Sequence, residues 1–228
     1  MNRTALSILL VFGMSAAGQA APKIAKSPTD LVPAGYVVVE EVQGDLNKDG
    51  KTDYVLLIKA TDKGKFFDHE YLGTRDRNRR GIIVAFENNG EYQLTLKNLD
   101  CFSSENEDGG VYFAPDLSIS VHKGSLFISY GHGRYGYWSY NFRYQNSDFE
   151  LIGYDSSQNR GPLIERSISI NFMTKKVLTR ENINQDAEDG DEHFKETWKR
   201  FTLPKAIKLE EIADFDDIYM ESLIESLE

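Results

Sequence analysis

The fold of this chain is constrained most by stretches in which apolar and polar residues alternate on both sides of a turn sequence. Each such stretch can form a β-hairpin in only a few registers, because a shift of one residue moves every apolar side chain to the other face. The first covers residues 82–96, where six apolar residues flank Asn88-Asn89-Gly90: Ile82, Val84, Phe86, Tyr92, Leu94 and Leu96. A three-residue loop with Gly90 at positive φ pairs Phe86 with Tyr92 and puts all six on one face. A two-residue Asn-Gly turn would pair Phe86 with Gln93 and spoil that face, so we predict the three-residue loop.

Other stretches also form hairpins in which the apolar residues pair and share one face. Lys123-Gly124 as a two-residue turn pairs apolar residues across 117–130: Val121 with Leu126, Ile119 with Ile128, and Leu117 with Tyr130. A four-residue loop from Gln145 to Asp148 pairs Tyr144 with Phe149 and Phe142 with Leu151. A fourth hairpin is expected around Ile168, Ile170, Phe172 and Val177, and a strand between His193 and Leu203. The pattern predicts an all-β fold, an antiparallel hairpin meander arranged as a propeller-like stack or a sandwich.

The two ends of the chain differ from this middle part. Residues 1–20 resemble a secretory signal, with Arg3, the apolar run 5–17 and small residues at Gly18-Gln19-Ala20. The apolar run is too short to span a bilayer. We therefore predict a signal peptide over 1–20, an extended leader over 21–35 and the β domain over 36–205.

The last segment, 206–228, is predicted as an acidic C-terminal helix. Its apolar residues recur at spacings of three and four: Ile212, Phe215, Ile218, Tyr219 and Leu223. We expect this helix to cap the sheet, and a tail that docks on a partner is the alternative.

Charge and cysteine content limit the partners. The 228 residues include 26 Lys and Arg and 36 Asp and Glu, and removing residues 1–20 removes only Arg3, which leaves a net charge of −11. An acidic surface argues against nucleic acid and anionic lipid as partners. Cys101 is the single cysteine, so no internal disulfide forms. We expect Cys101 to be a small buried hydrophobe, with a free thiol or an intermolecular bridge as alternatives.

One motif indicates a specific chemistry, the run from Asp45 to Asp53 with the pattern D-x-N-x-D-G-x-x-D. Oxygen ligands at positions 1, 3 and 5 converge when a chain wraps a cation, and glycine at position 6 permits the turn. The predicted Ca²⁺ ligands are the side chains of Asp45, Asn47, Asp49 and Asp53 and the backbone carbonyl of Lys51. The alternative is a calcium-free turn rich in Asp and Asn.

Position 12 of this loop is Leu56, inside the apolar run 54–58, where an EF-hand would carry glutamate. The loop instead resembles the calcium loops of FG-GAP/VCBS repeats, which link two strands and use the five ligands named above. That resemblance covers only Val37 to Ile58, and a single loop argues against a complete repeated propeller.

More loosely, the chain resembles secreted bacterial proteins that have no assigned function. The shared segments are Pro33-Ala34-Gly35-Tyr36, Gly44 to Asp53, Phe142-Arg143-Tyr144 and Leu151-Ile152-Gly153. This resemblance implies export and a similar fold but no activity.

The familiar hydrolase, nucleotide and zinc motifs are absent, and His69, His122, His132 and His193 lack ligand spacing. Two segments are candidates for a site because function concentrates in loops. One is Ala60 to Arg80, with its basic cluster Arg75, Arg77, Arg79 and Arg80, for which a solvated face is the alternative. The other is the Gly- and aromatic-rich loop 130–138 around His132, which could stack a sugar or peptide, although Trp138 is expected in the core.

These features favour an exported, calcium-binding, non-catalytic binding protein of the periplasm or cell exterior, with a protein or glycan partner. One alternative is a secreted hydrolase of an envelope polymer, built from residues 59–80 and 131–137, with Asp68, Glu70 and Asp76 as acid and base candidates. A deep cleft between those loops with a buried carboxylate or His132 would favour it. A periplasmic toxin-neutralising protein is the other alternative.

Overall fold

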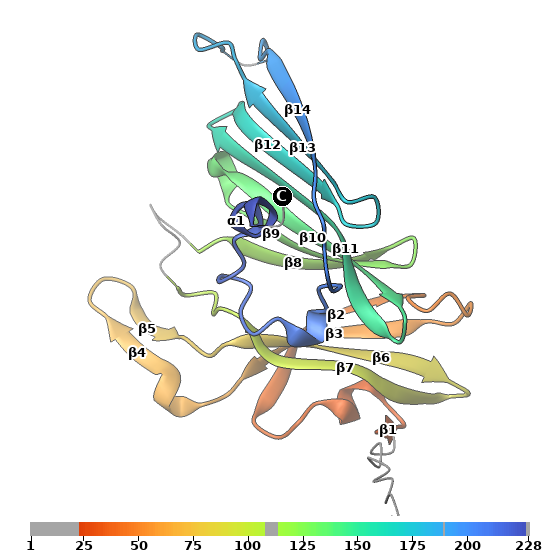
Figure 1. Cartoon of the computed structure of the whole chain (residues 1–228). Helices are drawn as coiled ribbons and strands as arrows, with labels where there is room; N and C mark the ends of the chain where they lie inside the picture. The colour runs from red at the N-terminus through yellow and green to blue at the C-terminus, as the bar shows by residue number, and fades with distance from the viewer. Residues whose placement is uncertain (1–22, 108–113, 189, 227–228) are drawn as a thin grey trace, which may run out of the picture.

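The computed structural model describes residues 23–107, 114–188 and 190–226, which form two antiparallel sheets and a small hairpin (Figure 1). The five-stranded sheet has the order β1 (Ile24–Ala25), β7 (Glu91–Phe102), β6 (Arg80–Asn88), β3 (Asp53–Ala60) and β2 (Tyr36–Gly44). The seven-stranded sheet has the order β14 (Phe194–Arg200), β13 (Lys176–Asn182), β12 (Leu163–Asn171), β11 (Asp148–Arg160), β10 (Gly136–Gln145), β9 (Ser125–Gly131) and β8 (Asp116–His122). The small hairpin pairs β4 (Phe66–His69) with β5 (Gly73–Asp76). The predicted all-β, antiparallel fold is confirmed, and its arrangement is a sandwich.

Helical segments are short. They are η1 (Pro28–Leu31), η2 (Lys63–Lys65), η3 (Gly133–Tyr135), η4 (Leu209–Glu211) and α1 (Met220–Glu225). In the part of the chain that the structure describes, no helix is long and apolar enough to cross a membrane.

The main core lies between the two sheets. The five-stranded sheet contributes buried residues of β3, β6 and β7: Val55, Leu57, Ile82, Val84, Phe86 and Leu96. The seven-stranded sheet contributes Ile119, Leu126, Ile128, Tyr140, Phe142 and Phe149. Cys101 is fully buried in this core, which confirms the expectation for that residue, and burial raises the pKa of its thiol.

Most of the predicted registers are confirmed. Ile119 pairs with Ile128 and Val121 with Leu126 across the Lys123-Gly124 turn. Tyr144 pairs with Phe149 and Phe142 with Leu151 as predicted, but Gln145 also pairs with Asp148, so the turn has two residues, Asn146 and Ser147, instead of four. The fourth hairpin pairs Ile170 with Val177, and β14 occupies the stretch expected to form a strand.

The register predicted for residues 82–96 is wrong. Asn89 and Gly90 both have positive φ, of 54° and 82°, and form the two-residue turn, so Phe86 pairs with Gln93. A register shift between Val84 and Ala85 then pairs Val84 with Leu96. This bulge returns Leu96 to the main core, while Leu94 packs on the outer face of the sheet.

The described part of the leader, residues 23–35, packs against the five-stranded sheet. Part of it is β1, which pairs with β7, and Leu31 of η1 is only 1% exposed. Leu31 packs with residues on the outer face of the five-stranded sheet: Leu56, Ile58, Ile83 and Ala85. Strands β3 and β6 are therefore buried on both faces, and this double burial explains their continuous apolar runs. The predicted signal peptide, 1–20, lies outside the described residues.

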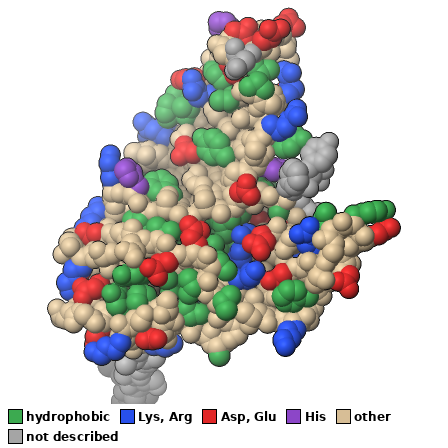
Figure 2. All heavy atoms as spheres, turned by 180° about the vertical axis from the view of Figure 1, so that it is seen from behind, with side chains coloured by type: hydrophobic (Ala, Val, Ile, Leu, Met, Phe, Trp, Pro, Cys, Tyr) green, Lys and Arg blue, Asp and Glu red, His purple; other side chains and the backbone are tan. Residues whose placement is uncertain are grey.

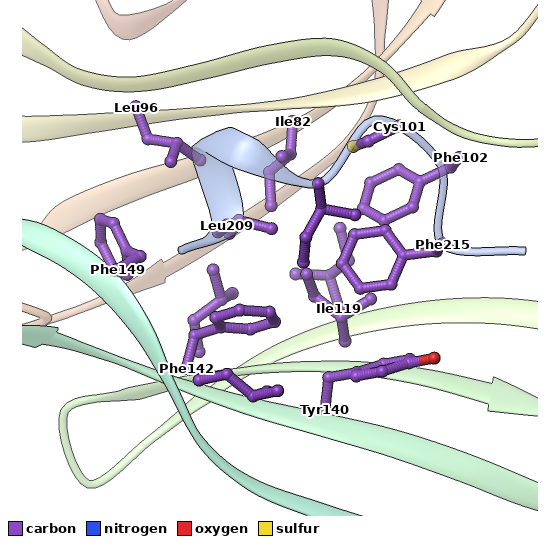
Figure 3. Packing of buried hydrophobic residues seen from close by; sticks show 14 of the residues in the cluster. Ile82, Leu96, Cys101, Phe102, Ile119, Tyr140, Phe142, Phe149, Leu209 and Phe215 are labelled. Carbon is purple, nitrogen blue, oxygen red and sulfur yellow. The ribbon is translucent and has the colours of Figure 1, made fainter. Parts of the chain in front are cut away.

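The C-terminal helix is much shorter than predicted, since among the described residues 206–226 only Met220–Glu225 is α-helical. Asn98 Nδ2 donates hydrogen bonds to the carbonyls of Leu209 and Ile212, at 3.0 and 2.7 Å, and the Phe215 N–H donates to the Cys101 carbonyl at 2.9 Å. Asp214 accepts a hydrogen bond from the Asp216 N–H at 3.0 Å, a local bond that competes with helix formation. Figure 3 shows Leu209 and Phe215 between the two sheets, so the segment is a wedge in the core rather than a cap.

Candidate functional site

The predicted calcium loop joins β2 to β3, as its sequence suggested, and Gly44 pairs with Asp53 where the two strands meet. Two loop residues have positive φ, Lys48 at 64° and Gly50 at 83°. Glycine adopts that conformation without strain, which accounts for Gly50 at the sixth position.

Side-chain oxygens hold the loop together. Asp45 accepts hydrogen bonds from the Asp49 and Gly50 N–H groups at 3.1 and 3.0 Å. Asn47 Oδ1 accepts from the Asp49 N–H at 3.0 Å, and Asp49 Oδ1 accepts from the Lys51 N–H at 2.9 Å. The loop is thus a series of Asp- and Asn-centred turns.

Asp53 has a different environment, because its side chain is fully buried. Its Oδ2 accepts a hydrogen bond from the Leu46 N–H at 2.8 Å, and its Oδ1 accepts one from the Glu87 N–H at 3.2 Å. Burial raises the pKa of the Asp53 carboxyl, and the backbone donors counteract part of that rise. Asp53 therefore ties the loop to the end of β6.

The oxygen-only donor set fits a hard cation such as Ca²⁺. The arrangement fits less well, because no three His, Cys, Asp or Glu side chains within residues 23–107, 114–188 and 190–226 form a metal-binding group. Asp53 faces backbone N–H groups below the loop, whereas Asp49 is exposed. Calcium at this loop stays a prediction.

A second candidate lies on the side of the molecule where the β4–β5 hairpin projects, and we call it the hairpin groove. It is a cavity of about 690 Å³ lined by residues of β4, β5 and the loop 131–135, by residues 105–107, and by Ala114 and Asp116. Side chains on one face of the hairpin, among them Phe67 and His69, form one wall. In Figure 2 the hairpin projects at the right, and basic and acidic side chains lie together where it meets the body.

The charges in the groove are mixed. Arg77 lies 3.8 Å from Glu107 and stacks on the Phe67 ring at 4.2 Å. Glu105 lies 3.4 Å from Lys59. Neither Arg75 nor Arg134 has a carboxylate partner in the described residues, and the Arg134 guanidinium lies 5.8 Å from the centroid of the Tyr135 ring. The groove therefore presents guanidinium groups that other described side chains do not neutralise.

A second hollow, also of about 690 Å³, shares Glu107, Ala114 and His132 with the hairpin groove. It continues along Tyr130 and Trp138, whose rings stack with centroids 5.3 Å apart. Trp138 packs against the main core, as expected. The Tyr130 hydroxyl is buried and has no hydrogen-bond partner in the described part of the chain.

The four arginines of the basic cluster 75–80 have two different roles. Arg75 and Arg77 line the groove. Arg79 donates to Asp214 at 2.6 Å and to the Asp100 carbonyl at 2.7 Å, and buried Arg80 donates to the Ser103 carbonyl at 2.9 Å. Arg79 and Arg80 thus stabilise the junction of β6, β7 and the C-terminal segment.

The three carboxylates considered as acid and base candidates do not line the groove. Asp68 accepts a hydrogen bond from Thr74 at 2.7 Å, and Glu70 is exposed. Burial works to raise the pKa of Asp76, but hydrogen bonds from Asn78 and the ion pair with Lys59 at 3.0 Å lower it overall. Asp76 is therefore a structural anion.

Three carboxylates that line the groove were not predicted from the sequence: Glu105, Glu107 and Asp116. The available signal was the polar, Gly-containing run 103–110 between two apolar strands, which is typical of a long loop.

Comparisons with protein families, curated proteins and solved structures find no match to this chain.

Proposed function

We propose that this chain is an exported, non-catalytic binding protein that holds a segment of a polymer in the hairpin groove. The observation that carries this proposal is the convergence of two distant segments on one groove. Residues of 67–77 and 131–135, singled out for separate reasons, line the same cavity. Concave sites with aromatic walls and a few polar groups are where proteins usually bind ligands.

A hydrolase is the second candidate, because those segments meet and His132 lines the cavity. The carboxylates weigh against it. Glu105 and Asp116 are exposed, and Glu107 is half-buried. A glycosidase needs a pair of carboxyl groups across the scissile bond, one of them in surroundings that keep it protonated, so binding without catalysis is the better proposal.

The proposal also includes export of the chain and binding of calcium at the Asp45–Asp53 loop. Signal-directed export places the chain in the periplasm or outside the cell, where calcium is available to a weak extracellular-type site. Calcium at the Asp45–Asp53 loop would rigidify the β2–β3 hairpin, with the side chains of Asp45, Asn47, Asp49 and Asp53 and the Lys51 carbonyl as ligands. A likeness to FG-GAP/VCBS loops is part of this proposal.

The groove proposal is tested by binding of residues 21–228 to immobilised polysaccharides and peptides. Arg134→Ala should weaken whatever binding the wild type shows, because Arg134 lines the groove. Arg200→Ala is the matched control, since Arg200 is an exposed arginine at the end of β14. Equal binding by both variants and the wild type would place the binding surface elsewhere.

The calcium proposal predicts that millimolar Ca²⁺ raises the Tm of the wild type by several degrees, whereas Mg²⁺ does not, because a ligand that binds only the folded state stabilises it. Asp49→Ala should remove most of this rise and leave the Tm in EDTA almost unchanged. Thr52→Ala, an exposed loop position outside the ligand set, serves as the control. An equal loss for Asp49→Ala with and without calcium would count against a metal role.

A further inference from the structure

We infer that the ligand of the hairpin groove is an acidic glycan, a chain of sugar rings with carboxylate groups at intervals; this inference rests on the proposed function. Two guanidinium groups of the groove remain without a carboxylate partner among the described residues once the internal ion pairs are counted. Glu107 lies near Arg77 and Glu105 near Lys59, which leaves Arg75 and Arg134 for a ligand. Arg75 Nε is shielded from solvent and has no hydrogen-bond partner among the described residues.

An unpaired guanidinium N–H in a concave site is a donor in need of an acceptor. Carboxylate is the acceptor whose geometry matches the planar fork of arginine, through two parallel hydrogen bonds. Arg75 lies on the β4–β5 hairpin, and Arg134 lies on η3 across the groove. Two anchors on separate elements suit a ligand with more than one carboxylate.

The groove also rejects a continuous polyanion. Glu105, Glu107 and Asp116 line it, and the whole chain has a net charge of −10. Uninterrupted negative charge would meet repulsion from these groups. Carboxylate side chains are, however, good acceptors for hydroxyl donors, so the mixture of arginine and carboxylate fits a ligand with many hydroxyls and few charges.

The wall of the groove is the face of the hairpin rather than an edge. Phe67 pairs with Arg75 and His69 with Gly73, and Phe67, His69 and Arg75 all line the cavity. An extended peptide is usually held by main-chain hydrogen bonds to a strand edge, which this wall does not offer. The Tyr135 ring, 5.3 Å from the His132 ring, offers an apolar surface for the C–H face of a sugar.

The length of the site favours a chain over a single small molecule. The second hollow shares His132 and Glu107 with the groove and extends to Tyr130 and Trp138.

The test compares immobilised polysaccharides in which only some of the sugar rings carry a carboxylate, such as hyaluronan, gellan and xanthan, with the same polymers after methyl esterification of their carboxylates. We expect at least one acidic glycan to bind residues 21–228, and esterification to weaken that binding by about tenfold or more. Arg75→Gln and Arg134→Gln should each have a similar effect, whereas Arg200→Gln, the control on β14, should leave binding unchanged. Unchanged melting temperatures would show that the variants are folded.

The outcomes separate the two proposals. Equal binding to the esterified polymer, or binding only to neutral glycans, would overturn the acidic-glycan inference and leave the groove proposal standing. Tighter binding to polyglutamate than to every glycan would also overturn the inference and indicate an acidic peptide. If none of the glycans or peptides binds, both proposals fail.

Discussion

Phe215→Ala should lower the free energy of unfolding by about 3–5 kcal/mol, the usual cost of removing a buried phenylalanine side chain. Phe215 is 2% exposed and packs against rings from both sheets. Its ring centroid lies 5.0 Å from that of Phe102 on β7 and 4.9 Å from that of Tyr140 on β10. The cavity left by alanine would therefore lie at the point where the two sheets meet.

Equilibrium unfolding in urea measures this effect. Tyr219→Ala, which removes a similar ring from the same segment, is the control, because Tyr219 is 71% exposed. A surface change of this kind should alter the unfolding free energy by no more than about 0.5 kcal/mol. Losses of similar size for the two variants would mean that the C-terminal segment does not insert between the sheets in solution.

Asp53→Ala should destabilise the protein by about 2–5 kcal/mol in EDTA, because it leaves backbone donors without an acceptor in a buried site. The donors are the N–H groups of Leu46, Glu87 and Asn47, all bonded to the fully buried Asp53 carboxylate. This loss does not require calcium, which distinguishes the buried Asp53 from the exposed Asp49.

The matched comparison is Asp49→Ala in the same calcium-free buffer. Asp49 is exposed and accepts hydrogen bonds only within the loop, from the Lys51 N–H and from Asn47 Nδ2, so water can replace the lost bonds. Urea unfolding of both variants should therefore give a large loss for Asp53→Ala and a small one for Asp49→Ala. Equal losses in EDTA would contradict the structural role of Asp53.

The sequence predicted those parts of the fold in which local pattern and tertiary packing agree. The hairpin 117–130 has one apolar face and a two-residue turn that requires positive φ at Lys123, observed at 51°, and its register is correct. The hairpin 82–96 failed because Tyr92 and Leu94 belong to the outer cluster, which exists only because the leader covers that face. An alternation rule with a single buried face cannot anticipate a sheet that is buried on both.

The same difference between local pattern and tertiary packing explains which parts of the candidate site could be predicted from the sequence. The Asp45–Asp53 motif is local, so its position between two strands could be predicted, whereas the burial of Asp53 under Glu87 of β6 depends on tertiary packing. The groove joins residues 67–77, 105–107 and 131–135, and only the fold brings these segments together. Glu107, for example, has no local signature, because its role depends on Arg77, the residue directly after β5.

The C-terminal wedge also determines when the protein can fold. The hydrogen bonds from Asn98 to Leu209 and Ile212 span 111 and 114 residues, so the core closes through contacts that form late in synthesis. A nascent chain that ends before Phe215 would expose the aromatic residues of both sheets, a condition that favours aggregation or capture by chaperones. Proteolysis near residue 205 would therefore unfold the whole sandwich instead of trimming a tail.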